Sequence, residues 1–150
     1  MRARDLARRC AALSADESVL RAVEMLADEG AAAIVVVTGE GHPFAILEGH
    51  HILAGTLPEA VRDDHLRASV VTDRLDHEVR AHMTTLTVAD VLPRRRAALA
   101  IVSPHASLLQ MSAVMARTGS PVVAVVQYDG DDRPRLLGTV TAATVLAHFR

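Results

Sequence analysis

The sequence predicts an α/β (α+β) fold that is built from two similar halves, each in the order strand, helix, strand, strand, helix. Two observations lead to this prediction. The segment that begins at Leu13 is repeated by the segment that begins at Val102, at a constant offset of 89 residues. Both segments also show the same series of features: a serine, a helical pattern of apolar residues, a glycine and a short β-branched run. Such a repeat indicates one supersecondary unit that occurs twice.

The repeat keeps its register from the first strand through the helix to the second strand. Its matched pairs are Ser14 and Ser103, Ser18 and Ser107, Leu20 and Leu109, Leu26 and Met115, Gly30 and Gly119, and Val36 and Val125. We expect Ser18 and Ser107 to cap helices, because a serine hydroxyl accepts an N–H that the first helical turn leaves unpaired. Gly30 and Gly119 lie where a left-handed residue commonly ends a helix.

Two apolar runs rich in β-branched residues predict a central strand in each half. They cover residues 33–37 and 122–126, and runs of this length are typical of strands buried on both faces. The elements expected after them are strands at 44–47 and 135–140 and short closing helices around Ile52 and Val145.

The segment from Pro58 to Thr85 predicts one amphipathic helix between the halves. Its apolar residues recur at spacings of four or five, at Leu66, Val70, Leu75, Val79 and Met83. We expect this helix to bridge the halves or to cover a dimer surface. The domains that follow are 1–57 for the first repeat, 58–85 for the intervening helix and 86–150 for the second repeat.

Composition excludes several classes of function. The net charge is −2 and the aromatic residues are Phe44, Tyr128 and Phe149, so neither a basic surface nor stacking platforms for nucleic acid are expected. No apolar run approaches the roughly 20 residues that a membrane helix needs, so we expect no membrane insertion. The single cysteine, Cys10, allows no intrachain disulfide and fits a soluble, cytoplasmic protein.

Few residues suggest covalent or acid–base chemistry. The sequence has no Ser-His-Asp, paired-carboxylate or phosphate-loop pattern, so we do not expect an enzyme. Arg8 and Arg9 precede Cys10 and would lower the pKa of its thiol. The basic run Arg94–Arg96 either lies in a solvated linker or faces a phosphate or an acidic partner.

Four short segments, in this order, resemble those of the CBS domain. They are Ala3-Arg4-Asp5-Leu6 with its echo Val88-Ala89-Asp90-Val91, Val102-Ser103 through Ser107, Gly119-Ser120-Pro121-Val122, and Gly138-Thr139-Val140-Thr141. The resemblance implies a Bateman module, in which two CBS repeats pack sheet to sheet as a pseudo-twofold pair. It further implies a homodimer, inter-repeat clefts that bind AMP, ATP or S-adenosylmethionine, and control of an effector protein.

The resemblance also implies where a ligand would bind in the second repeat. In the family, a Thr caps the closing helix beside the phosphate and an Asp three residues later binds the ribose. Thr141 matches the Thr, but Thr144 replaces the Asp, which removes a charge-assisted contact worth about 1.5–3 kcal/mol. The full candidate set is Ala100, Ile101, Ser120, Pro121, Val122, Gly138, Thr141 and Thr144.

The first repeat departs further from the family pattern. Glu48 replaces the Thr and His51 replaces the Asp, so we expect this half-site to reject nucleotide phosphates. Glu48, His50 and His51 are all metal-capable, but adjacent histidines are expected to diverge, so we predict no metal site. Two main functions stay open: a homodimeric sensor of an adenosine-containing molecule, and a ligand-free scaffold that regulates an enzyme or transporter. A third, minor alternative is a metal- or redox-responsive module that uses His50, His51 or Cys10.

Overall fold

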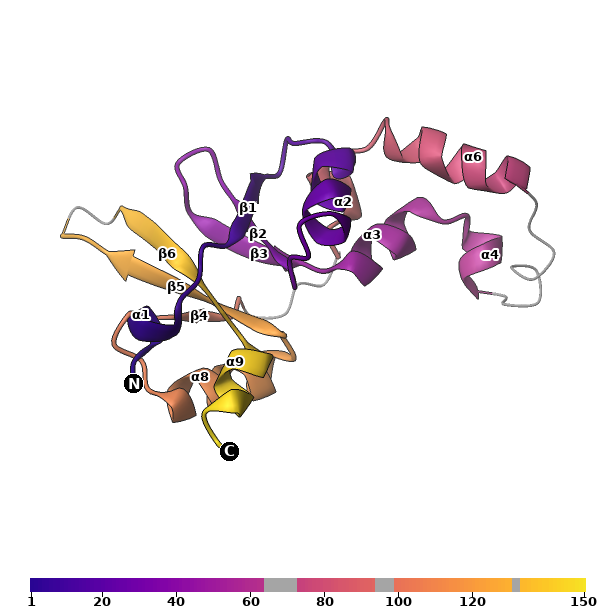
Figure 1. Ribbon diagram of the computed structural model, residues 1–150. Coiled ribbons are helices and arrows are strands. Elements are labelled where there is room, and N and C mark those ends of the chain that lie inside the picture. The colour runs from indigo at the N-terminus through magenta and orange to yellow at the C-terminus, as the bar shows by residue number, and fades with distance from the viewer. Residues whose placement is uncertain (64–72, 94–98, 131–132) are drawn as a thin grey trace.

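The computed structural model describes residues 1–63, 73–93, 99–130 and 133–150. Within these residues, helices surround two three-stranded sheets, with strand orders β1-β2-β3 and β4-β5-β6 (Figure 1). In each sheet the first two strands are parallel and the last two are antiparallel. The repeated order of strand, helix, strand, strand, helix is therefore confirmed.

The two halves consist of matching elements. The first half contains β1 (Ala11–Ser14), α2 (Val19–Ala27), β2 (Ile34–Val37), β3 (Pro43–Leu47) and α3 (Gly49–Thr56). The second half contains β4 (Ile101–Val102), α8 (Leu108–Thr118), β5 (Val122–Tyr128), β6 (Pro134–Thr141) and α9 (Ala142–Ala147). The two central apolar runs are β2 and the start of β5, and they are buried as expected.

Both predicted serine N-caps and the glycine at the end of α8 are confirmed. The Ser18 hydroxyl accepts the Leu20 N–H at 3.2 Å, and the Ser107 hydroxyl accepts the Gln110 N–H at the same distance. Gly119 ends α8 in the left-handed conformation, with φ of 67°. Gly30 is also left-handed, with φ of 68°, but it lies beyond the residue that ends α2.

A mixed apolar cluster joins the two sheets. Val35 of β2 and Ala124 and Val126 of β5 are buried together. On β5 the alternate residues Val123 and Val125 instead enter the core beneath the helices of the second half. Because side chains alternate across a strand, β5 contributes both to the cluster between the sheets and to the core of the second half, which explains its continuous apolar run.

Two short helices each pack against the core of the half other than the one that precedes or follows them most closely in sequence. Helix α1 (Ala3–Leu6) belongs to the second core, and α7 (Val88–Val91) belongs to the first. Backbone hydrogen bonds hold them there, including Ala3 N–H to Ala106 O at 2.9 Å and Val88 N–H to Glu17 O at 2.8 Å. Each spatial unit therefore includes a segment from the other side of the boundaries proposed from the sequence.

This exchange explains why residue 138 is a glycine. The backbones of Arg8 and Thr139 exchange two hydrogen bonds, at 2.9 and 3.0 Å, which brings the chain onto β6. A Cβ at Gly138, where φ is 156°, would lie 2.3 Å from the Arg8 carbonyl oxygen. Gly138 thus has a structural task that is independent of any ligand.

The single helix expected at 58–85 is wrong for the described residues. They form α4 (Glu59–Asp63) and α6 (Asp73–Met83), whose axes are not collinear in Figure 1. Leu66 and Val70 lie outside the described residues. A straight helix of that length would extend about 40 Å beyond a small core, whereas α6 packs on α3 and places Met83 against the first core.

Across the described residues, no helix combines the length and the apolar character needed to cross a membrane.

Candidate functional site

The closing turn of the second repeat holds the two threonines predicted to face a ligand. Thr141 is the N-cap of α9, and its hydroxyl accepts the Thr144 N–H at 3.1 Å. The two side-chain hydroxyls also lie 3.0 Å apart, in hydrogen-bond contact. The capping role expected for Thr141 is therefore confirmed, and Thr144 is its direct partner.

These contacts occupy groups that an anion would otherwise use. The Thr141 and Thr144 hydroxyls bond to each other, and the Ala142 N–H donates to the Pro121 carbonyl at 2.9 Å. A phosphate at this turn would have to replace the contact between the two hydroxyls. In the structure, the polar groups of this helix cap therefore pair with one another.

The other predicted residues lie on both faces of the second sheet. Val122 is aligned with Thr141 across β5 and β6, and Ile101 packs in the cluster between the sheets. Ala100 is only 1% exposed within the helix-side core, and its carbonyl accepts the Ala124 N–H at 2.8 Å. The Ala100 side chain is therefore turned away from the space between the sheets.

A cavity of about 520 Å³ lies beside this turn, between the helices of the second half and the first repeat. Of the predicted set, Ser120 and Pro121 are among its lining residues, as is Ala142. Its walls are largely apolar, with Met115, Ala116, Val145, Leu146 and Phe149 from α8, α9 and the residues after α9. Glu48 of the first repeat completes it, so the cavity carries a carboxylate rather than a cation for a phosphate.

The closing turn of the first repeat has a different hydrogen-bond pattern. Glu48 is the N-cap of α3, and its backbone N–H donates to Nδ1 of His51 at 3.0 Å. Burial lowers the pKa of His51, and the neighbouring His50 lowers it further, while the Glu48 carboxylate opposes both effects. Neutral imidazole is the form that accepts this hydrogen bond.

The side chains of this turn converge. One potential ligand atom from each of Glu48, His50 and His51 lies within 4.8 Å of the other two, and the imidazole centroids are 4.1 Å apart. The expectation that the adjacent histidines diverge is therefore wrong. In a helix each Cα–Cβ bond tilts toward the N-terminus, which leans both rings back toward Glu48.

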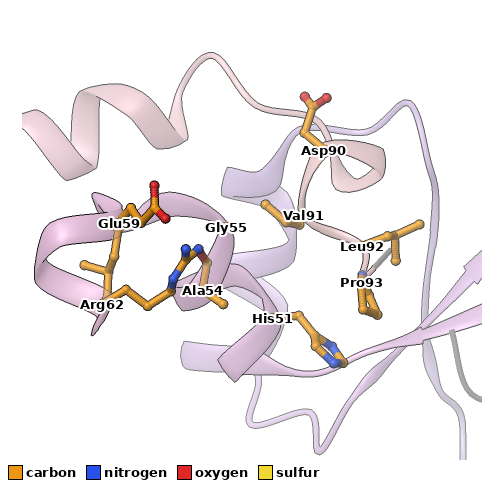
Figure 2. Close-up of a pocket in the computed structure, with 10 residues that line it drawn as sticks. His51, Ala54, Gly55, Glu59, Arg62, Asp90, Val91, Leu92 and Pro93 are labelled. Carbon is orange, nitrogen blue, oxygen red and sulfur yellow. The ribbon is translucent and has the colours of Figure 1, made fainter. Parts of the chain in front are cut away.

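A second cavity, of about 610 Å³, borders the same turn (Figure 2). His51 and Pro93 lie at one end in the figure and Glu59 and Arg62 at the other, with Val91 of α7 between them. This cavity could not be predicted from the sequence, because α7, which contributes Asp90 and Val91 to its lining, packs against the first half from a distant part of the chain.

Asp90 also borders this cavity, but its carboxylate points away from the other labelled side chains in Figure 2. It accepts the backbone N–H of Thr87 at 2.8 Å and the Thr87 hydroxyl at 3.1 Å. These two bonds lower the pKa of Asp90. Asp90 therefore caps α7 and is not poised for acid–base chemistry.

Two further sequence features bear on the site. Cys10 is half-buried in the cluster between the sheets, and burial raises the pKa of its thiol. The lowering expected from Arg8 and Arg9 is therefore wrong, because both side chains are exposed while the thiol is desolvated. Arg94–Arg96 lie outside the described residues.

Comparisons with known proteins identify the fold. No family model matches the chain, and no curated protein sequence matches it. Among solved structures, a CBS domain-containing protein of unknown function from Kribbella flavida is 27% identical, with a TM-score of 0.81 and complete coverage of both chains. The CBS domain of a CBS domain-containing membrane protein from Sphaerobacter thermophilus is 22% identical, with a TM-score of 0.67, over 98% of this chain and 86% of that one.

A third similar structure is that of CBSX2 in complex with AMP. It is 16% identical, with a TM-score of 0.62, and the match covers 99% of this chain and 95% of that chain. The internal repeat, the two matching sheets and these similarities together show that the chain has the fold of a tandem pair of CBS domains.

Proposed function

We propose that this protein is a non-enzymatic regulatory module that works as a CBS-pair homodimer and modulates a partner protein in the cytoplasm. One observation carries the dimer: exposed leucines occur at matching positions of both repeats. Leu20 and Leu109 are 37% and 72% exposed on α2 and α8. Leu53 and Leu146 are 54% and 65% exposed on α3 and α9.

The occurrence of exposed leucines at equivalent positions of both repeats supports a second copy of the chain as the partner that covers them. Contiguous exposed apolar patches commonly mark interaction sites. Leu146 also lines the apolar cavity that Glu48, the N-cap of α3, completes. A surface whose apolar residues are related by a pseudo-twofold axis suits an isologous dimer, in which both partners use the same patch.

Sedimentation velocity of leucine variants tests this proposal. We expect Leu109→Glu and Leu146→Glu to shift the protein from dimer to monomer, because each places a charge in a desolvated interface. Tyr128→Glu is the matched control, since Tyr128 is 60% exposed on β5 rather than on these helices. A dimer that survives both leucine variants would show that another surface pairs the chains.

A second proposed function is the sensing of an adenosine-containing ligand by the second repeat. It is favoured by Thr141 at the helix cap and by the AMP complex of CBSX2. Binding would exchange the bond between the Thr141 and Thr144 hydroxyls for bonds to the ligand. The first repeat presents Glu48 at the matching position, so we assign the ligand to the second repeat alone.

Thermal unfolding with AMP, ATP and S-adenosylmethionine tests the sensing function. A ligand present at 100 times its Kd stabilises the folded state by about 2.7 kcal/mol, which raises Tm by several degrees in a domain of this size. We expect Thr141→Glu to abolish this shift and Tyr128→Glu, at an exposed position of β5 outside the cavity, to preserve it. A folded dimer that responds to none of these compounds would instead support the ligand-free scaffold.

A further inference from the structure

We propose that Glu48, His50 and His51 form a binding site for a divalent transition metal of the Zn²⁺ class at the N-terminus of α3. The site would lie where the second repeat has the cap of α9. When Glu48 is placed on Thr141, the positions of His50 and His51 fall on Ala143 and Thr144. The first repeat therefore carries two imidazoles and a carboxylate where the second carries two hydroxyls and a methyl group.

The chemistry of the three side chains suits such an ion. Zinc binds imidazole nitrogen and carboxylate oxygen at about 2.0–2.2 Å, so neighbouring ligand atoms around it are separated by roughly 3–3.5 Å. The potential ligand atoms here already lie within 4.8 Å of one another. To reach coordination distance, each pair of ligand atoms must approach by at most about 1.5 Å, a movement on the scale of side-chain rotation.

The site is accessible and incomplete, as expected for an exchangeable ion. His50 is exposed, and Glu48 and His51 are half-buried, so a metal can enter from solvent. Three protein ligands leave at least one position for water or another ligand. A site of this kind is expected to bind more weakly than a closed structural site with four protein ligands.

Binding must overcome two local costs. The Nδ1 lone pair of His51 accepts the Glu48 N–H in the metal-free arrangement, so ligation by His51 through Nδ1 displaces that hydrogen bond, and ligation through Nε2 requires the other tautomer. The positive end of the α3 dipole also opposes a cation, whereas the Glu48 carboxylate offsets this effect. The first cost supplies a specific signal, because the Glu48 amide must respond when the metal binds.

Calorimetric titration of the tag-free protein with ZnCl₂ and NiCl₂ tests the proposal. We expect one ion per chain, and we expect His50→Ala, His51→Ala and Glu48→Gln each to weaken binding at least tenfold. His105→Ala and His148→Ala are the controls, since both are exposed histidines of the second half. Circular dichroism confirms folding, and His50→Ala is the decisive variant because its exposed side chain is not needed for the core.

NMR spectra recorded with added Zn²⁺ give an independent readout. We expect the backbone amide of Glu48 and the ring signals of His50 and His51 to shift together and to saturate at one equivalent. The proposal is overturned if the folded protein binds neither metal, if the three variants bind as tightly as the wild type, or if Zn²⁺ moves the signals of other histidines while the Glu48 amide stays in place.

Discussion

The closing turns of the two repeats have similar backbone conformations at the helix N-cap but carry different polar side chains. In the second repeat Thr141 and Thr144 bond to each other and complete the cap of α9 within a single turn. In the first repeat the Glu48 amide bonds to the His51 ring, and a carboxylate and two imidazoles converge above α3. The comparison teaches that both halves keep the same architecture through apolar and capping residues, while a few polar positions give the two turns different chemical groups.

The largest expected difference between the halves lies in the packing beneath their first helices. Met111 of α8 is fully buried, and the matching residue of α2 is Ala22, which is equally buried. We expect Met111→Ala to destabilise the protein by about 2–5 kcal/mol, because it leaves a cavity that the first half does not have. Urea unfolding measures the loss. The companion variant Ala22→Gly, which removes a single methyl group, should cost less, and an equal cost would contradict the assigned packing.

The second prediction concerns Gly138 of β6, which lies against the backbone of Arg8. Gly138→Ala would place a methyl group against the Arg8 carbonyl, and we expect a loss of about 1–3 kcal/mol from this overpacking. Gly39→Ala is the control, because a Cβ at Gly39 meets open space. Urea unfolding of both variants checks the result. Equal stability of the two would mean that Arg8 does not pair with Thr139 in solution.

The helix caps offer a smaller contrast. Ser107 and Gln110 satisfy each other's backbone N–H groups, whereas the third position after Ser18 is Arg21. Replacing a capping serine with alanine typically costs about 1 kcal/mol. We expect Ser107→Ala to exceed Ser18→Ala in its cost, as measured by thermal unfolding. The reverse order would show that the reciprocal cap adds nothing to α8.

The smallest expected effect is the loss of stability at low pH that comes from Asp90 of α7. Asp90 accepts two hydrogen bonds from Thr87, which lower its pKa below 3.8 in the folded state. The unfolded state therefore binds more protons in this window, so the contribution of Asp90 is complete above pH 3.8 and is lost as the pH falls below it. We expect Asp90→Asn to flatten the pH dependence of urea unfolding between pH 5 and about 3. An unchanged slope would contradict the assigned role.

Local features of the fold could be predicted from the sequence. Ser18, Ser107 and Thr141 cap helices, and Gly119 ends one, because these roles depend on residues only a few positions away. The buried strand β5 could be recognised because a continuous apolar run fits few other structures. These predictions are confirmed. They were possible because each feature depends on neighbouring residues.

The features that the sequence did not reveal depend on contacts between distant segments. The exchange of α1 and α7, the demand for glycine at Gly138 and the cavity beside Val91 all arise from pairing across the two repeats. The convergence of His50 and His51 depends on side-chain directions in the first turn of α3, which the spacing of residues does not determine. The prediction of one helix over 58–85 is wrong because apolar spacing alone does not show that α4 and α6 have different axes.

The mass of the wild-type protein in solution tests the central claim most directly. The chain has a mass of 16.0 kDa, and the leucines that match between the repeats predict a dimer of twice that mass. Sedimentation velocity at micromolar concentration should therefore show a single species of dimer mass. A monomer of 16.0 kDa under the same conditions would contradict the account and leave the exposed leucines for a different partner.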